Sequence, residues 1–370
     1  MHTLSNSGCR NRRNLPMKPK KKIRIELIDI AKAITIFLVI LGHTTGNRDT
    51  PMYRRLLYAF HMPLFFVLAG MSIRPAAIHG WEAWKSFLRK NILALIVPYL
   101  IWAFVYAPFS FDNVPRFLYG SWEALGNAQT LTSLWYLTAF FVARILMQCL
   151  FSLFDKLELK NVTRASGICA VPLFVVGFLF PKLQNGYPWC FNVAFVAAGF
   201  IMLGVAFRTP ILILAQQEGW VLGAVFAGSL GLLLGGTVLR GDALELSLMC
   251  GSEYGNIFWF LLNSVSGTMS VLSASMLLQR LAREGSQPFS TAAVSYIGQH
   301  TLGIFLLHKN MLQMLILPWI RSWLPGPDLL TAFVGSCVAL AGSMVLCTAI
   351  ERYVPQLLGQ FPKYQEQPAA

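Results

Sequence analysis

Charged side chains are scarce in this sequence. Asp, Glu, Lys and Arg together make up 12% of the 370 residues, whereas hydrophobic residues make up 55%, and the mean hydropathy is +0.56. A soluble globular protein carries roughly 25% charged residues, so this composition excludes a soluble enzyme of the same length. It indicates a polytopic membrane protein instead.

The sequence also lacks the cysteine patterns that are typical of metal sites. Its seven cysteines include no CxxC pair and join no His/Cys cluster with metal-ligand spacing. Most of them lie in apolar stretches, where a free thiol behaves as a small hydrophobic side chain. We therefore expect no metal cofactor.

No long linker, low-complexity block or internal repeat is visible along the chain. We therefore predict one transmembrane domain over 24–352. A basic, disordered cytoplasmic tail is expected at 1–23, and a second cytoplasmic tail at 353–370. Met17, which precedes the basic run KPKKKIR, is an alternative start of the protein.

Long apolar stretches fill most of the chain. A helix needs about 20 apolar residues to cross a bilayer, and about ten stretches meet this length, which predicts an all-α bundle of about ten transmembrane helices. The predicted spans lie near 25–44, 57–73, 91–109, 131–153, 165–181, 189–207, 219–239, 256–279, 295–318 and 329–350.

Basic residues are distributed unevenly over the segments between these spans. With the N-terminus in the cytoplasm, 20 of the 30 Lys and Arg residues fall in cytoplasmic segments and 7 in outer ones. Short cytoplasmic loops hold such an excess, so we expect the N-terminus inside. An even number of helices then places the C-terminus in the cytoplasm as well.

The formal net charge of +14 comes in large part from the N-terminal tail. A juxtamembrane basic segment usually sets topology and attracts anionic lipid, so we expect membrane lipid and not nucleic acid as its partner. The first apolar stretch contains charges and no small-residue cleavage pattern follows it, so it is predicted to remain as a signal anchor.

The first predicted span carries Asp29 and Lys32 near its start and ends on His43. Charges inside a spanning segment cost several kcal/mol and usually serve a function. Asp29 and His43 are about 21 Å apart along a helix and within about 40° of one face. That face is suited to line a groove across the membrane, although a simple i, i+3 ion pair between Asp29 and Lys32 is the alternative.

Further polar candidates lie at or inside other spans. His61 precedes Pro63 at the start of the second span, Trp135 opens the fourth, Arg144 lies within the fourth, and His308 lies in the ninth, next to Lys309. Each is a candidate for substrate binding. The structural alternatives are a histidine that hydrogen-bonds its neighbours, an interfacial tryptophan and an arginine that binds nearby carbonyl groups.

Five motifs occur in a characteristic order: IDIAKAITIFLVILGH at 28–43, FHMPLFFVLAGM at 60–71, LIVPYLIW at 95–102, LWYLTAFF at 134–141 and IGQHTLGIFLLH at 297–308. In this order and spacing the chain resembles the acyltransferase 3 family of membrane-bound O-acyltransferases over about residues 24–350. Around His61 it is similar to the branch that is related to fucose O-acetylases.

The resemblance implies a multi-pass enzyme of the bacterial inner membrane. It implies transfer of an acyl group, usually acetyl from cytoplasmic acetyl-CoA, to a hydroxyl of a cell-surface or exported carbohydrate. The essential histidine of the family carries over to His43, and Asp29 and Lys32 fall where the family places a carboxylate and a basic residue. A histidine can act as the general base or can itself accept the acyl group first, and both routes stay open.

The sequence departs from the family pattern before the third span. The family commonly has two arginines spaced as RxxR there, whereas this chain has only the adjacent Arg89 and Lys90. They are the candidates for binding the phosphates of the donor, and positive-inside anchors are the alternative.

A different function class is a transporter or flippase of a glycan or lipid-linked sugar, which also needs buried charges. Such a protein more often shows an inverted repeat with paired Gly/Pro breaks, and no such repeat is visible in the sequence. A membrane sensor or scaffold has no use for a histidine at the end of a helix. The acyltransferase interpretation is therefore favoured.

Overall fold

The computed structural model describes residues 25–44, 51–107, 110–126, 131–240, 246–284, 291–310, 315–323 and 329–361. The predicted N-terminal tail at 1–23 and most of the predicted C-terminal tail, residues 362–370, lie outside the described residues. The division into one domain and two tails therefore stays a prediction.

The described residues are almost entirely helical, and an isolated bridge between Leu248 and Glu253 is their only β-type pairing. The α-helices are α1 (Glu26–Gly42), α2 (Met52–Tyr58), α3 (His61–Ser72), α4 (Trp81–Asn91), α5 (Val97–Tyr106), α6 (Val114–Tyr119), α7 (Trp122–Leu125), α8 (Trp135–Lys156), α9 (Val162–Leu179), α10 (Phe191–Leu214), α11 (Gly219–Leu239), α12 (Ile257–Glu284), α13 (Thr291–Gln299), α14 (Thr301–Asn310), α15 (Leu317–Trp323) and α16 (Leu329–Tyr353). A π-helix, η1, spans Ile92–Ile96, and 3₁₀ turns occupy η2 (Phe111–Asn113), η3 (Thr132–Leu134), η4 (Pro188–Cys190), η5 (Met249–Gly251) and η7 (Pro355–Leu358).

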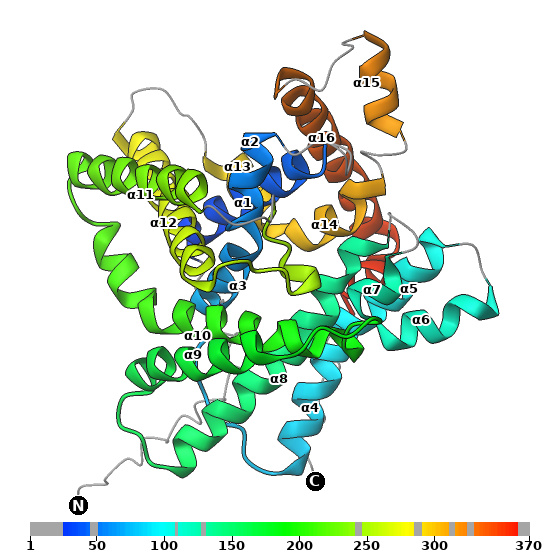
Figure 1. Cartoon of the computed structure of the whole chain (residues 1–370), viewed down its shortest axis with the longest axis vertical. Coiled ribbons are helices and arrows are strands. Elements are labelled where there is room, and N and C mark those ends of the chain that lie inside the picture. The colour runs from blue at the N-terminus through cyan, green and yellow to red at the C-terminus, as the bar shows by residue number, and fades with distance from the viewer. Residues whose placement is uncertain are drawn as a thin grey trace, which may run out of the picture.

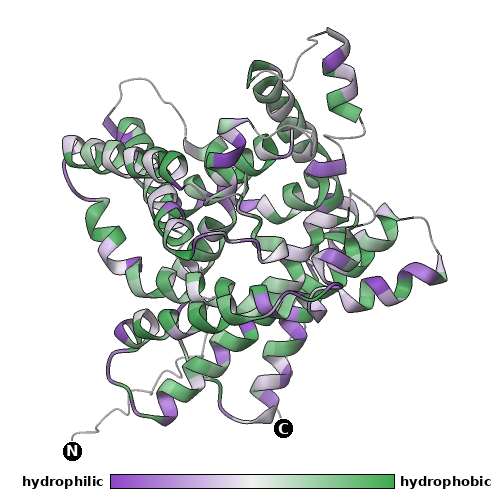
Figure 2. Ribbon diagram, in the orientation of Figure 1, coloured by the Kyte–Doolittle hydropathy of each residue, from purple (hydrophilic) through white to green (hydrophobic). Residues whose placement is uncertain are grey.

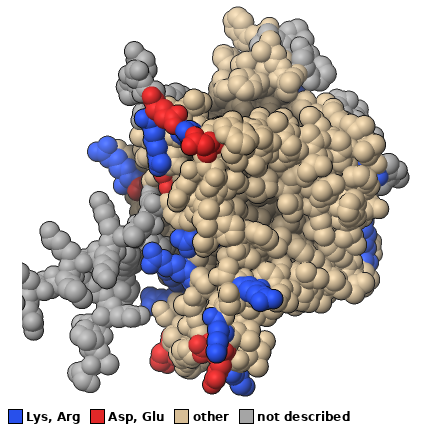
Figure 3. Space-filling view, turned by 90° about the vertical axis from the view of Figure 1, so that its left-hand side faces the viewer, with Lys and Arg blue, Asp and Glu red and all other residues tan. Residues whose placement is uncertain are grey.

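Within the described residues, eight helical segments are long and apolar enough to cross a membrane, which confirms the prediction of a polytopic all-α membrane protein. They are Met52–Ser72, Trp81–Tyr106, Thr132–Lys156, Val162–Leu179, Pro188–Leu214, Gly219–Leu239, Ile257–Glu284 and Leu329–Tyr353. Hydrophobic residues run along most of the helices (Figure 2). Lys and Arg gather along one edge of the face seen in Figure 3, and a broad part of that face carries no charged side chain.

Two of the predicted spans form shorter helices. The stretch 25–44 contains α1, which has 17 residues. The stretch 295–318 is divided at His300 into α13 and α14, where the His300 ring bonds to the Tyr296 carbonyl oxygen and lies 2.9 Å from a Glu351 carboxylate oxygen. Such short helices are tolerated inside a membrane protein when other helices surround them.

Helix α1 lies in the middle of the bundle (Figure 1). It contacts α3, α12, α13, α14 and α16, and Ile30, Ala31, Ile36 and Ile40 along it are fully buried. A helix that is apolar on all sides is expected in such a position. Its polar ends, Asp29 and Lys32 on one side and His43 on the other, are therefore presented inside the protein.

Helix α3 is held close to α10 by two glycines. A Cβ atom on Gly70 would overlap the backbone of Ile201, and one on Gly204 would overlap the backbone of Val67. Small residues at a crossing allow two membrane helices to approach closely. This contact fixes α3, which carries His61 at its first position and Phe65 one turn further on.

Candidate active site

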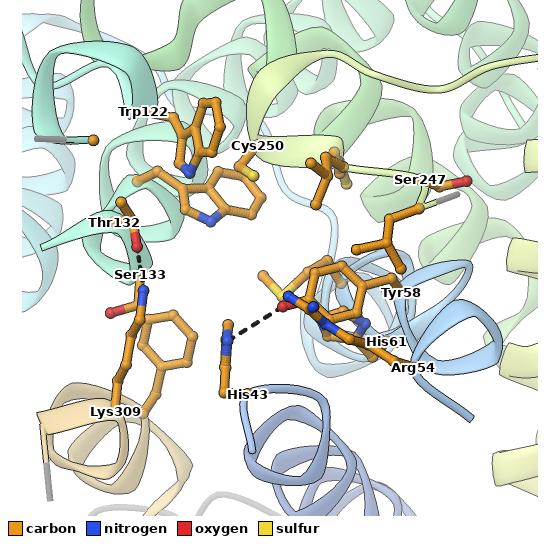
Figure 4. A pocket seen from close by; sticks show the side chains of 17 residues that line it. His43, Arg54, Tyr58, His61, Trp122, Thr132, Ser133, Ser247, Cys250 and Lys309 are labelled. Carbon is orange, nitrogen blue, oxygen red and sulfur yellow. Dashed lines mark hydrogen bonds between the residues drawn. The ribbon is translucent and has the colours of Figure 1, made fainter. Parts of the chain in front are cut away.

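A cavity of about 390 Å³ lies at the C-terminal end of α1, and we call it the His43 pocket (Figure 4). Its lining comes from the end of α1, from α2, α3, α7, η3, α8, η5 and α14, and from the segment before η5. The lining residues are His43, Arg54, Tyr58, His61, Met62, Trp122, Gly126, Thr132, Ser133, Trp135, Leu246, Ser247, Leu248, Met249, Cys250, Phe305 and Lys309.

His43 is positioned by the end of α1 and by Tyr58. Its backbone N–H bonds to the Ile40 carbonyl oxygen and so terminates the helix. A Cβ on Gly42 would lie only 3.2 Å from the Tyr58 ring, so the glycine leaves room for the tyrosine. The Tyr58 hydroxyl oxygen is 3.3 Å from His43 Nδ1, as the dashed line in Figure 4 shows.

Tyr58 is itself held by Arg54, one turn earlier on α2. The Arg54 guanidinium carbon lies 5.1 Å from the centre of the tyrosine ring, which is the distance of a cation–π contact. Residues spaced i, i+4 on a helix meet in this way. Arg54, Tyr58 and His43 thus form a connected polar row along the pocket.

Two further histidines lie beside His43. His61 Nδ1 donates to the Leu57 carbonyl oxygen, at 2.5 Å, and its ring centre is 4.9 Å from that of Tyr58. His308 Nδ1 donates to the Phe305 carbonyl oxygen, at 2.7 Å, and its ring centre is 5.5 Å from that of His43. A carbonyl oxygen only accepts, so in the neutral rings the lone pair is on Nε2.

The pocket is positively charged. Lys309 and Arg54 are only 6% and 5% exposed, and Lys309 donates to the Thr132 hydroxyl. Among the described residues no Asp or Glu lines this cavity. Buried cations act through a low effective dielectric, so the arrangement favours a group on which negative charge develops.

Cys250 also lines the pocket, in η5 between the spanning helices. Desolvation raises the pKa of its thiol, so the sulfur stays protonated near neutral pH and is a poor nucleophile. Within the described ranges no group of three or more His, Cys, Asp and Glu side chains is arranged to hold a metal ion. Two supported imidazoles line this cavity: His43 is hydrogen-bonded to the Tyr58 hydroxyl, and His61 to the Leu57 carbonyl oxygen.

A second cavity, of about 690 Å³, opens near the N-terminal end of α1, and we call it the basic pocket. Four cationic side chains and one carboxylate line it, together with aromatic and aliphatic residues. The lining residues are Ile25, Ile28, Asp29, Lys32, Phe65, Ala69, Ser72, Ile73, Arg74, Phe87, Leu95, Tyr136, Phe140, Arg144, Met147, Gln148, Arg208, Gly298, Gln299, Thr301, Leu302 and Phe305.

The cations of the basic pocket come from four helices or their ends. Arg208 of α10 donates to the Ile73 carbonyl oxygen, at 3.3 Å, next to Arg74. Arg144 of α8 lies over the Phe140 ring, with 5.7 Å between its guanidinium carbon and the ring centre, and its Nε is buried without a hydrogen-bond acceptor among the described residues. Asp29 accepts a long hydrogen bond, of 3.5 Å, from the Gln299 amide.

The structure divides the residues that the sequence singles out between these two cavities. His43, His61 and Trp135 line the His43 pocket, and His308 lies beside it. Asp29, Lys32 and Arg144 line the basic pocket. Their roles stay predictions, but their separation into two groups is a structural finding.

Arg89 and Lys90, the residues predicted to bind the donor, lie elsewhere. Both are exposed on α4 and line neither cavity. Phe87 of the same helix does line the basic pocket. The two residues are therefore close in sequence to the pocket wall without being part of it.

Sequence reasoning missed several lining residues. Arg54 and Tyr58 were not linked to His43, although their i, i+4 spacing would have signalled a shared face if α2 had been recognised as a helix. Arg74 and Arg208 lie between predicted spans and contribute to the cytoplasmic excess of basic residues, and Phe305 has no polar side-chain atom. The folded arrangement alone brings these residues to the two cavities.

Comparison with known proteins gives a consistent result. A family model described as an acyltransferase domain matches residues 25–351. The nodulation protein NolL of Mesorhizobium japonicum is 28% identical over 243 residues, which is 55% of this chain and 63% of that protein. The nodulation protein NolL of Sinorhizobium fredii is 30% identical over 176 residues, or 44% of this chain and 45% of that protein.

The matched regions therefore cover less than two thirds of either relative. No solved structure matches the chain significantly.

Proposed function

Because the chain belongs to the acyltransferase 3 family and is thus a membrane acyltransferase, we propose that it transfers an acetyl group from acetyl-CoA to a hydroxyl of a cell-surface or exported carbohydrate. We further propose the bacterial inner membrane as its site, since the relatives are bacterial. Acetyl-CoA acts here as a substrate, and the acceptor is recognised by its hydroxyl and its sugar ring.

The observation that carries this proposal is the position of α1 between two cavities. Asp29 and Lys32 at one end open into the basic pocket, and His43 at the other end opens into the His43 pocket. Lys32 and His43 are about 16 Å apart along the helix axis. One buried helix thus joins a site suited to an anionic donor to a site suited to proton transfer.

The basic pocket supports donor binding. Coenzyme A carries several phosphate oxygens, and guanidinium groups bind such oxygens through charge-assisted, often bidentate hydrogen bonds. Arg74, Arg144 and Arg208 supply these groups, and the cavity volume falls within the range of about 300–1,000 Å³ that is usual for small-molecule sites. The expected orientation, with the N-terminus inside, places this pocket toward cytoplasmic acetyl-CoA.

The His43 pocket supports the acceptor and the chemistry. Trp122 and Trp135 line it and present flat surfaces on which a sugar ring can stack. When Nδ1–H of His43 donates to the Tyr58 oxygen, the Nε2 lone pair is free to take the proton of the attacking hydroxyl. The Arg54–Tyr58 contact keeps the tyrosine in place for this tautomer.

In the direct route the acceptor oxygen attacks the thioester carbonyl carbon while His43 Nε2 takes the hydroxyl proton. The tetrahedral oxyanion then collapses, the carbon–sulfur bond breaks, and the thiolate leaves with the proton from His43. The Lys309 ammonium stabilises the oxyanion because it is already desolvated and fixed by Thr132. In the second route His43 Nε2 attacks the thioester carbonyl carbon and the carbon–sulfur bond breaks, which releases the CoA thiolate. The acceptor hydroxyl then attacks the acetyl carbon, the bond to Nε2 breaks, and the hydroxyl proton passes to the thiolate.

The test is mass spectrometry of surface glycans from cells that make the wild-type protein, no protein, or His43→Ala at matched membrane levels. We expect one acetyl group per modified sugar, which is lost in both the deletion strain and the variant. An unchanged acetyl pattern together with a changed amount of glycan or lipid-linked sugar would favour the transporter instead.

A further inference from the structure

One side chain lies between the two cavities. Phe305 lines both the His43 pocket and the basic pocket, and no other described residue lines both. It is 5% exposed, so its ring is enclosed by protein and not by the membrane. The cavities are therefore neighbours that share one aromatic wall.

Helix α14 runs from one cavity to the other. Thr301 lines the basic pocket, Phe305 lines both, and Lys309 lines the His43 pocket. These three residues are spaced by four and so follow one face of the helix over about 12 Å. Helix α3 also lines both cavities, in the opposite chain direction, with Met62 in the His43 pocket and Phe65 in the basic pocket.

The material between the cavities is aromatic and uncharged. The Phe305 ring centre lies 5.2 Å from that of Tyr136, and Tyr136 in turn lies 5.2 Å from Phe66 and 5.5 Å from Phe140. Aromatic rings at such distances pack in contact with one another. A thioester that enters from the basic pocket therefore meets Phe305 before it reaches His43.

We propose that Phe305 is the gate between the donor and acceptor pockets and that its ring restricts the transferred acyl group to short chains. This inference rests on the proposed function, because it concerns the path of the donor thioester. A rotation of the ring lets the acetyl thioester at the end of the pantetheine chain pass into the His43 pocket. A longer acyl chain must displace the adjacent Tyr136 ring as well, and a packed wall resists this.

The expected change in donor preference can be taken from the selectivity of apolar pockets for chain length. One methylene group more or less is discriminated by roughly 10–200-fold in kcat/KM. Replacing Phe305 by Ala removes the ring that opposes the longer chain. We therefore expect the ratio of butyryl to acetyl transfer to rise by about tenfold or more in Phe305→Ala, and Phe305→Leu to give a smaller rise.

The experiment uses the full-length protein in proteoliposomes, with methyl fucoside as the acceptor probe and acetyl-, propionyl-, butyryl- and hexanoyl-CoA as donors. The acylated fucoside is quantified by mass spectrometry. Leu307→Ala is the matched control, because Leu307 is buried on the same helix and lines neither cavity. It is expected to leave the order of donors unchanged.

Phe305→Trp provides an independent test in the opposite direction. A larger ring is expected to slow transfer from every donor by about tenfold or more, while the binding of desulfo-CoA to the basic pocket stays unchanged. An unchanged ratio of butyryl to acetyl transfer in Phe305→Ala, together with unchanged transfer rates in Phe305→Trp, would overturn the gate and leave the proposed function intact. Absence of transfer from all four donors by the wild type would overturn the proposed function and the gate with it.

Discussion

The two cavities at the ends of α1 use cationic side chains in different ways. In the His43 pocket Lys309 and Arg54 are almost fully buried and stand among three histidines. In the basic pocket Arg74 is exposed and Lys32, Arg144 and Arg208 are half-buried. A charge near solvent binds a charged ligand from water, whereas a desolvated and fixed charge acts on electron density that moves during a reaction.

The number of basic residues alone therefore does not predict which of the two cavities binds the donor and which carries out the reaction. The degree of burial and the fixed hydrogen-bond partners distinguish them. Substitutions in the His43 pocket are accordingly expected to lower kcat, and substitutions in the basic pocket to raise KM for the donor. Each of the following experiments tests one side of this contrast.

The largest effect is expected for His43→Ala. Removing a general base or a nucleophile typically costs roughly 10²–10⁴-fold in rate, and transfer should fall by this factor while donor binding and membrane insertion persist. Rates with purified protein and a donor-binding assay measure the two quantities separately. His79→Ala, at an exposed position with 75% of its side chain accessible, is the control. Retained transfer in well-expressed His43→Ala protein would remove this residue from its role.

The next effect is expected for Lys309→Met, which keeps an unbranched side chain that is one atom shorter and removes its charge. Loss of one donor to a developing oxyanion costs about 10²–10³-fold in kcat, and the donor KM should stay the same. Steady-state kinetics at several donor concentrations separates the two parameters. Lys156→Met, in the exposed last turn of α8, should behave as the wild type. A change in KM alone would assign Lys309 to binding.

A smaller effect with the opposite signature is expected for Arg144→Gln. Loss of a charge-assisted hydrogen bond, about 1.5–3 kcal/mol, should raise the donor KM by roughly ten- to a hundredfold and leave kcat nearly unchanged. Competition by free CoA reports binding directly. Arg352→Gln is the matched control, because Arg352 is exposed in the last turn of α16 and lines neither cavity. A fall in kcat at constant KM would contradict the division of roles.

The smallest effect is expected for the reversal of Arg89 and Lys90 to Glu. From their position before the third predicted span, the sequence predicts that reversing both charges sharply raises the donor concentration that transfer requires. In the structure, however, both side chains are exposed and lie outside the wall of the basic pocket. Exposed ion pairs contribute about 0.2–1 kcal/mol, so we expect a rise in donor KM of about fivefold or less. Salt should abolish this rise. A rise as large as that of Arg144→Gln would extend the donor site to α4.

The general architecture could be predicted from the sequence because long apolar stretches have few alternatives in a bilayer, where backbone groups must bond within a helix. The same reasoning located His43, since a polar residue at the end of such a stretch is costly and conspicuous. It did not find the break at His300 between α13 and α14, because hydropathy is summed over a window and is insensitive to a single turn.

The composition of the two sites was less predictable. Tyr58 and Phe305 are not charged, and Arg54 lies in the short segment between the first two predicted spans. Their roles depend on which atoms they face: the Tyr58 oxygen faces His43 Nδ1, and Phe305 faces both cavities. His43 and Phe305, for example, are 262 positions apart along the chain, and no local pattern in the sequence relates them.

The amino-acid sequence by itself determined that this protein is a bundle of membrane-spanning helices, that it resembles the acyltransferase 3 family and that His43 ends its first helix, because hydrophobicity and motif order are properties of the chain. The tertiary structure alone decided which cations are buried beside His43, which open into the second cavity and which residue separates the two. The reason is that the burial of a side chain and its effective dielectric are set by the helices packed around it, which come from distant parts of the chain.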